Sequence, residues 1–180
     1  SGSTRSITVA ARTDTTDHWL NPLRGFRSRV SAEMAGHFLG GTFDFTKYEA
    51  EYSQFFQVGS NRQTIAVRAL GGLSFGEIRE AAEEFRVGGT DTVRGYTYGS
   101  MIGDRMAVFN AEYRFPISDN VHGVVFADVG TAWMNGEEDP TFKAGYGIGA
   151  RLDTPIGVLR LDYGIGEEGG RLHFQLGPSF

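Results

Sequence analysis

Along much of this chain every second side chain is apolar, and the residues between are charged, polar or glycine. The run from Arg105 to Phe115 shows this most clearly. Its apolar positions share one parity and its mainly polar positions share the other: Ala107, Phe109, Ala111, Tyr113 and Phe115 against Met106, Asn110, Glu112 and Arg114. Because successive Cβ atoms of a strand point to opposite sides of the pleat, a period of two indicates extended strands. The pattern predicts a sheet with one apolar face and one polar face.

About nine runs of this kind are separated by turn signals such as Pro116, Asn135-Gly136 and Gly169-Gly170. They lie near residues 6–13, 26–34, 46–58, 64–73, 105–115, 121–133, 142–153, 157–165 and 171–180. Runs of this length at this spacing, with no long helical pattern among them, predict an all-β antiparallel fold.

A long segment, residues 77–104, interrupts the alternation and is rich in glycine and charge. Residues 78–85 within it are compatible with one or two helical turns. A connection of this length inside a compact meander is usually functional or disordered. No linker or internal repeat marks a second domain, so we expect a single β-barrel domain over residues 1–180, with residues 77–104 as its long loop.

The composition narrows the class of protein further. Twenty-six glycines with five prolines among 180 residues are typical of a turn-rich all-β chain. The absence of cysteine excludes disulfides and thiolate chemistry, and a net charge of -5 without a basic tract argues against a nucleic-acid partner. No apolar run is long enough for a membrane-spanning helix, which excludes helical spanning only, because barrels cross with short alternating strands.

Alternation alone fits both a soluble, lipocalin-like barrel with an apolar lumen and a membrane barrel with an apolar outer belt. Three features favour the membrane barrel. Charges of both signs crowd the polar face, although a solvated outer face would show the same mix. Gly145, Gly147 and Gly149 fall on the polar face, where missing side chains help the backbone curve or leave room for something packed inside. Large aromatics end several runs, as interfacial girdles do: Phe115, Trp133, Tyr163 and Phe180.

The interrupting segment contains a short motif, Val93-Arg94-Gly95-Tyr96, preceded by Gly88-Gly89-Thr90. Other segments follow a fixed order around it: NPLRG at 21–25, AEYRFP at 111–116, FADVGTAW at 126–133, TPIG at 154–157 and a terminal Phe180. Together these segments resemble the BamA-type outer-membrane assembly and translocation family, also called the bacterial surface antigen family. The resemblance spans nearly the whole chain. It implies an antiparallel transmembrane β-barrel, here of about 8–10 strands, with a long lumen-inserted loop.

The resemblance also implies a lock between the loop and the wall. In the family this loop folds back into the lumen and its arginine pairs with acids on the wall, which here would be Arg94 with Glu112 and Asp128. Parity independently places both acids on the polar face. An arginine can bind carboxylates through bidentate, charge-assisted hydrogen bonds. Gly95 would allow a tight turn and Tyr96 would pack on the wall. The alternative is an ordinary loop arginine and two solvated lumen acids.

The end of the chain resembles the assembly signal of the family. Its outward parity continues through the final run to a terminal aromatic: Leu172, Phe174, Leu176 and Phe180.

The chain departs from the family in one respect, because members carry POTRA domains before a larger barrel. We therefore expect either a fragment or a naturally reduced member. Nine strands would make the first and last strands meet in parallel, which bacterial single-chain barrels avoid. Either one run is misread, or two chains combine into a larger barrel. A homodimer is therefore one of the expected alternatives.

No residues suggest catalysis. His18, His37, His122 and His173 have no zinc spacing, and no serine stands in a nucleophile elbow. We expect no enzyme activity, catalytic residue, cofactor or metal.

The expected function is that of an outer-membrane β-barrel protein related to the machinery that inserts β-barrel proteins, in a bacterial-type outer membrane. Its partners would be membrane lipid, unfolded outer-membrane proteins and other assembly factors. The alternatives are a structural or small-pore barrel without insertase activity, and a soluble ligand-binding barrel.

Overall fold

The computed structural model describes residues 2–59, 61–78, 82–137, 139–155 and 157–177. Strands dominate it, with one short 3₁₀ turn. The elements are β1 (Ser6–Asp14), β2 (Gly25–Ala35), η1 (His37–Leu39), β3 (Phe45–Val58), β4 (Gln63–Gly76), β5 (Phe85–Val87), β6 (Met101–Gly103), β7 (Arg105–Ser118), β8 (Val121–Trp133), β9 (Lys143–Thr154), β10 (Gly157–Gly166) and β11 (Gly169–Leu176). The all-β, antiparallel fold expected from the alternation is confirmed.

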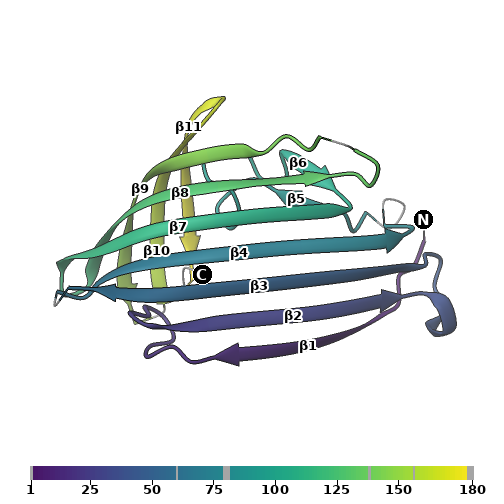
Figure 1. The fold of residues 1–180 in the computed structure, drawn as a ribbon, viewed down its shortest axis with the longest axis horizontal. Helices are drawn as coiled ribbons and strands as arrows, with labels where there is room; N and C mark the ends of the chain where they lie inside the picture. The colour runs from purple at the N-terminus through teal and green to yellow at the C-terminus, as the bar shows by residue number, and fades with distance from the viewer. Residues whose placement is uncertain (1, 60, 79–81, 138, 156, 178–180) are drawn as a thin grey trace.

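Nine strands form one antiparallel sheet in the order β1-β2-β3-β4-β7-β8-β9-β10-β11, while β5 and β6 pair only with each other. Figure 1 shows β1 to β4 side by side along the long axis, with β10 and β11 turning steeply across it. Within the described residues no pairing joins β1 to β11, so the sheet is open. Because neighbouring strands alternate in direction, β1 and β11 run the same way.

The two faces of the sheet have opposite chemistry. On β7, Phe109 and Tyr113 are 47% and 38% exposed, whereas Asn110 and Glu112 between them are each 2% exposed. A similar alternation runs along the other strands of the sheet, whereas β1 is exposed throughout. Large apolar side chains cover the outer face, and the inner face carries most of the buried charged side chains together with a few aromatic ones. A soluble barrel with an apolar lumen would have the opposite orientation. A continuous apolar outer face instead suits contact with lipid.

No helix within the described residues is long and apolar enough to cross a membrane.

Strand β7 departs from the expected boundary at Pro116. The sequence predicts an end there, but β7 continues to Ser118, and its register with β8 shifts between Pro116 and Ser118. A proline lacks the N–H that a regular ladder needs, and an irregularity in the ladder accommodates that loss. At the other end of the chain, β11 stops at Leu176.

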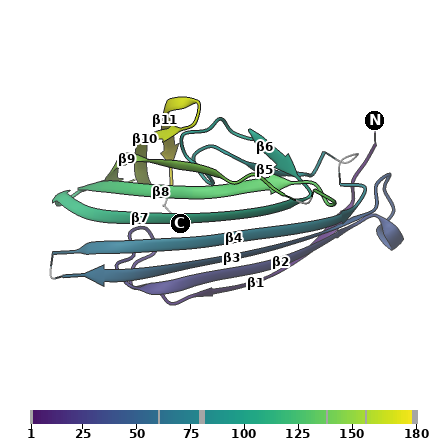
Figure 2. The same cartoon turned by 45° about the horizontal axis from the view of Figure 1, so that its top comes forward.

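Residues 77–104, here called the inserted loop, connect β4 to β7, and residues 85–104 of this loop lie on the inner face. In Figure 2 the sheet curves around β5 and β6, which contact β7 and β8. The buried core beneath the loop is formed by Phe85, Val87, Val93, Tyr96, Met106 and Val108. Residues 79–81, on which the expected helical turns of 78–85 depend, lie outside the described residues, and Phe85 begins β5. The loop therefore packs its apolar side chains against Met106 and Val108, which lie on the inner face of β7.

Hydrogen bonds to Asp17 hold the connection between β1 and β2, residues 15–24, in shape. Asp17 accepts hydrogen bonds from the backbone N–H groups of Leu23 (2.9 Å) and Arg24 (3.2 Å). Partial burial opposes the charge of Asp17, but these donors hold the pKa of its carboxyl below the usual value.

We expect Asp17→Ala to loosen this connection at neutral pH, at a cost of about 1 kcal/mol or less, because two hydrogen-bond acceptor contacts at a partly exposed site are lost. A carboxyl whose pKa is lowered on folding contributes its stabilisation above the unfolded value, near about pH 4, and loses it as the pH falls through the lowered value. Proteolysis of residues 15–24 measures the effect. A wild-type protein that is cleaved as readily as the variant at neutral pH would contradict it.

Candidate functional site: the inserted loop against the barrel wall

The loop tip, residues 93–96, is held in shape by a compact turn. The Gly89 N–H donates to the Val93 carbonyl (3.0 Å), and the Gly88 N–H donates to the Thr92 hydroxyl (2.8 Å). Gly95 has a φ of 94°, a left-handed conformation that favours glycine. The turn directs the Arg94 side chain toward the wall.

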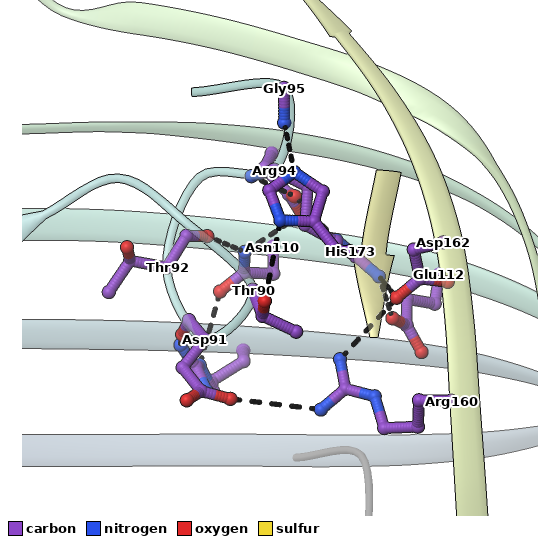
Figure 3. A network of polar contacts seen from close by, with 12 residues as sticks. Thr90, Asp91, Thr92, Arg94, Gly95, Asn110, Glu112, Arg160, Asp162 and His173 are labelled. Carbon is purple, nitrogen blue, oxygen red and sulfur yellow. Dashed lines mark hydrogen bonds and ion pairs between the residues drawn. The ribbon is translucent and has the colours of Figure 1, made fainter. Parts of the chain in front are cut away.

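Arg94 is buried (1% exposed) and reaches three carboxylates on three different strands. Its Nε and Nη2 donate to the two oxygens of Asp128 at 2.7 and 2.8 Å. Its Nη1 donates to Glu112 Oε1 at 2.6 Å and to Asp162 Oδ2 at 3.3 Å. The Arg94 backbone N–H adds a bond to Asp128 (3.0 Å). Figure 3 shows the arginine between the loop and the wall.

The surroundings keep Arg94 charged. Burial opposes the charge, but hydrogen bonding to Asp128 and the attraction of Glu112 hold the pKa of Arg94 above its usual range. Its guanidinium carbon also lies 3.5 Å from the centre of the Phe126 ring, a cation–π contact. Arg94 is therefore a fixed positive charge at neutral pH.

The acids of the wall are shared with other arginines. Glu112 also accepts from Arg114 Nε (2.8 Å) and Arg151 Nη2 (3.2 Å), and Asp162 accepts from Arg151 Nη1. We call Arg94, Glu112, Asp128, Asp162, Arg114 and Arg151 the Arg94 cluster. Buried charges are tolerated when they are paired and hydrogen-bonded. Asp128 depends most on Arg94, because its other side-chain hydrogen bond comes from Asn110 (2.8 Å), a neutral group.

Glycines of the wall make room for the loop tip. A Cβ on Gly145 of β9 would lie 1.9 Å from the Arg94 carbonyl oxygen, and one on Gly164 of β10 would lie 2.6 Å from the Gly95 nitrogen. Tyr96 closes the contact, since its hydroxyl donates to the Ala144 carbonyl (2.9 Å). The space that the sequence left open at Gly145 is occupied by the inserted loop.

The structure thus brings Arg94, Glu112 and Asp128 together, with Val93 and Tyr96 packed in the core below the loop. Sequence reasoning missed Asp162 and His173, which contact Arg94 and Gly95. Both lie on the polar parity of their strands, but no motif marked them.

The residues of the expected assembly signal lie apart from this site. Leu172, Phe174 and Leu176 are exposed on the outer face of β11, at 69%, 69% and 50%. Phe180 lies outside the described residues.

An antiparallel sheet with an apolar outer face, an ionic inner face and a loop bound inside has the features of the wall of a β-barrel membrane protein. Residues 1–180 match the Omp85 superfamily domain over their whole length. The chain therefore belongs to the Omp85 superfamily, and the resemblance to BamA-type proteins is confirmed.

Named relatives come from bacteria and chloroplasts. The chain is 31% identical over 195 residues to outer membrane protein assembly factor BamA of Nitratidesulfovibrio vulgaris, covering 93% of this chain and 24% of that protein. It is 39% identical over 107 residues to outer envelope protein 80, chloroplastic, of Arabidopsis thaliana, covering 53% of this chain and 15% of that protein. The chain thus spans a quarter or less of the length of either relative.

The fold agrees with a solved BamA structure. BamA from Haemophilus ducreyi lacking POTRA domains 1–3 superposes with a TM-score of 0.79 over 95% of this chain and 40% of that chain. At 17% sequence identity this similarity shows the fold alone. The open sheet corresponds to part of a BamA-type barrel.

Proposed function

We propose that this chain is the barrel region of an outer-membrane assembly protein, and that it assists the insertion of β-barrel proteins into a bacterial-type outer membrane. The observation that carries the proposal is the buried contact of Arg94 with Asp128 and Glu112 inside an Omp85-type sheet. The relative named as an outer membrane protein assembly factor supports the role and the bacterial-type location, and the one named as an outer envelope protein supports an outer envelope membrane.

Within this proposal residues 1–180 act as one domain that forms part of the barrel wall, and the inserted loop acts as its plug. Val93, Arg94, Gly95 and Tyr96 lock the plug to Glu112 and Asp128. A lumen occupied by a loop does not conduct large solutes.

The protein would act on its clients through the unpaired edge of its sheet. An unpaired strand edge presents backbone N–H and C=O groups that a client strand can pair with. The exposed apolar side chains of β11, Leu172, Phe174 and Leu176, would contact lipid and, with Phe180, form the assembly signal. Client strands of unfolded outer-membrane proteins and further assembly factors are the proposed partners.

Strand direction argues against completion by a second copy. Since β1 and β11 run the same way, two copies in the same membrane orientation would join parallel strands at both seams. Antiparallel barrels avoid such seams. We propose instead that an odd number of further strands completes the barrel.

The experiment is an insertion assay. Full-length protein in liposomes is mixed with a urea-unfolded outer-membrane barrel, and insertion is followed by heat-modifiable gel mobility. We expect faster insertion than in protein-free liposomes, and a smaller acceleration for Arg94→Ala. Arg86→Ala, an exposed arginine of the same loop, serves as the matched control. A folded protein that gives no acceleration would overturn the insertase function and favour a structural barrel.

A further inference from the structure

His173 joins the edge strand β11 to the inserted loop. It lies on the inner face, 9% exposed, and pairs in register with Asp162 of β10. Its Nε2 lies 3.0 Å from the Gly95 nitrogen, which donates to it, and its Nδ1 lies 3.3 Å from the Thr90 hydroxyl. Figure 3 shows the ring between these two loop residues.

These contacts define the protonation of the ring. A backbone N–H can only donate, so Nε2 must offer its lone pair to Gly95. The neutral ring then carries its proton on Nδ1, which donates to the Thr90 hydroxyl. A second proton on Nε2 would face the Gly95 N–H, so that two donors would oppose each other and the contact would break.

The charges around the ring come from every neighbouring element. Arg94 belongs to the loop, Asp162 to β10, Asp128 to β8, and Arg171 to β11 itself. The two negative carboxylates balance the two positive guanidinium groups, and both carboxylates already form ion pairs with Arg94. The specific consequence of protonating His173 is therefore that Nε2 no longer accepts the hydrogen bond from the Gly95 N–H.

We infer that His173 is a positioning residue that couples the edge strand β11 to the loop tip, and that protonating its imidazole releases the strand from the loop. This inference deepens the proposed function, because β11 is the edge that a client strand would meet. Of the described hydrogen bonds, those between the loop and β11 both involve His173. Loss of this one side chain would leave β11 bonded along β10 alone.

Hydrogen exchange of the full-length protein in detergent tests the coupling between β11 and the loop tip. Exchange is followed in peptides spanning 88–99 and 171–176, and each measured rate is divided by the intrinsic chemical rate at that pH. Between about pH 7.5 and about pH 4, a range wide enough for a buried imidazole to titrate, we expect acid to speed exchange of both wild-type peptides by about fivefold to tenfold. His173→Ala should exchange fast at both pH values. His173→Gln, whose amide oxygen replaces Nε2 as acceptor but does not titrate, should stay protected at both.

A spectroscopic measurement separates coupling from general loosening. ¹⁵N NMR of the His173 ring should show the neutral form with the proton on Nδ1, and Thr90→Val should weaken that preference. His122→Ala is the matched control, because His122 is an inner-face histidine of β8 whose ring contacts Asn21 of the β1–β2 connection and not the loop tip.

A proton on Nε2 at neutral pH, an exchange rate in His173→Ala equal to the wild-type rate, or a pH response that persists in His173→Gln would each overturn the inference. Should His173→Ala not fold, the glutamine variant and the ring spectrum still decide. None of these measurements needs insertion activity, so a failure here differs from a failure of the proposed function.

Discussion

Replacing Arg94 by alanine should release the inserted loop and destabilise the sheet by about 3 kcal/mol. The change leaves three buried carboxylates without their shared partner. Removing one member of a buried charge network costs more than the net worth of the pair, because the remaining charge stays desolvated. The expected result is a lower urea midpoint in detergent and faster proteolysis within residues 85–104.

The loss should fall unevenly on the acids. Glu112 keeps Arg114 and Arg151, and Asp162 keeps Arg151. Among its described hydrogen bonds, Asp128 keeps only neutral donors, the Asn110 amide and the backbone N–H of residue 94. Asp128→Asn should therefore partly rescue Arg94→Ala, so that the double variant costs less than the sum of the single variants. Arg94→Lys should be intermediate, since an ammonium keeps the charge but cannot form the bidentate contact.

Arg86→Ala again provides the matched control, because it removes an exposed arginine from the same loop. An Arg94→Ala protein with a wild-type urea midpoint and wild-type proteolysis would mean that the contact contributes nothing to the folded state. Strict additivity with Asp128→Asn would place the coupling elsewhere.

Much of the fold could be predicted because strand parity is a local property. The alternation of Phe109 and Tyr113 with Asn110 and Glu112 is readable in the sequence, and burial in the structure follows the same alternation. Strands β5 and β6 escaped detection, since three residues are too few to show a period of two. Their pairing depends on the path of the loop over the inner face.

Only part of the site could be predicted from the sequence, for a related reason. Glu112 and Asp128 lie within recognisable segments, 111–116 and 126–133, so a motif and a parity together indicated them. Asp162 lies 68 positions from Arg94, and His173 lies 78 positions from Gly95. Their meeting requires the curvature of the sheet and the register of β9, β10 and β11. Those are properties of the assembled sheet, and no single segment encodes them.

Gly145→Ala should disrupt the same contact without altering any charge. The added Cβ would lie 1.9 Å from the Arg94 carbonyl oxygen, and 3.6 Å from a methyl of Val93. The first atom belongs to the loop backbone, which cannot rotate away as a flexible side chain can. Overpacking of this kind costs about 1–3 kcal/mol and here should move the whole loop tip. We expect proteolysis within residues 85–104 to rise nearly as much as in Arg94→Ala.

Gly71→Ala separates this steric effect from a general cost of changing a strand glycine. Gly71 lies on β4 with no left-handed φ, and its added Cβ would meet only the Met106 carbonyl oxygen, at an ordinary 3.9 Å. That variant should keep the wild-type urea midpoint and an intact loop. If the loop tip rests on β9 as the structure shows, the two alanines must differ. Equal proteolysis and equal urea midpoints in Gly145→Ala and Gly71→Ala would mean that the loop does not touch the wall there, and the role of Arg94 as a lock would fall with it.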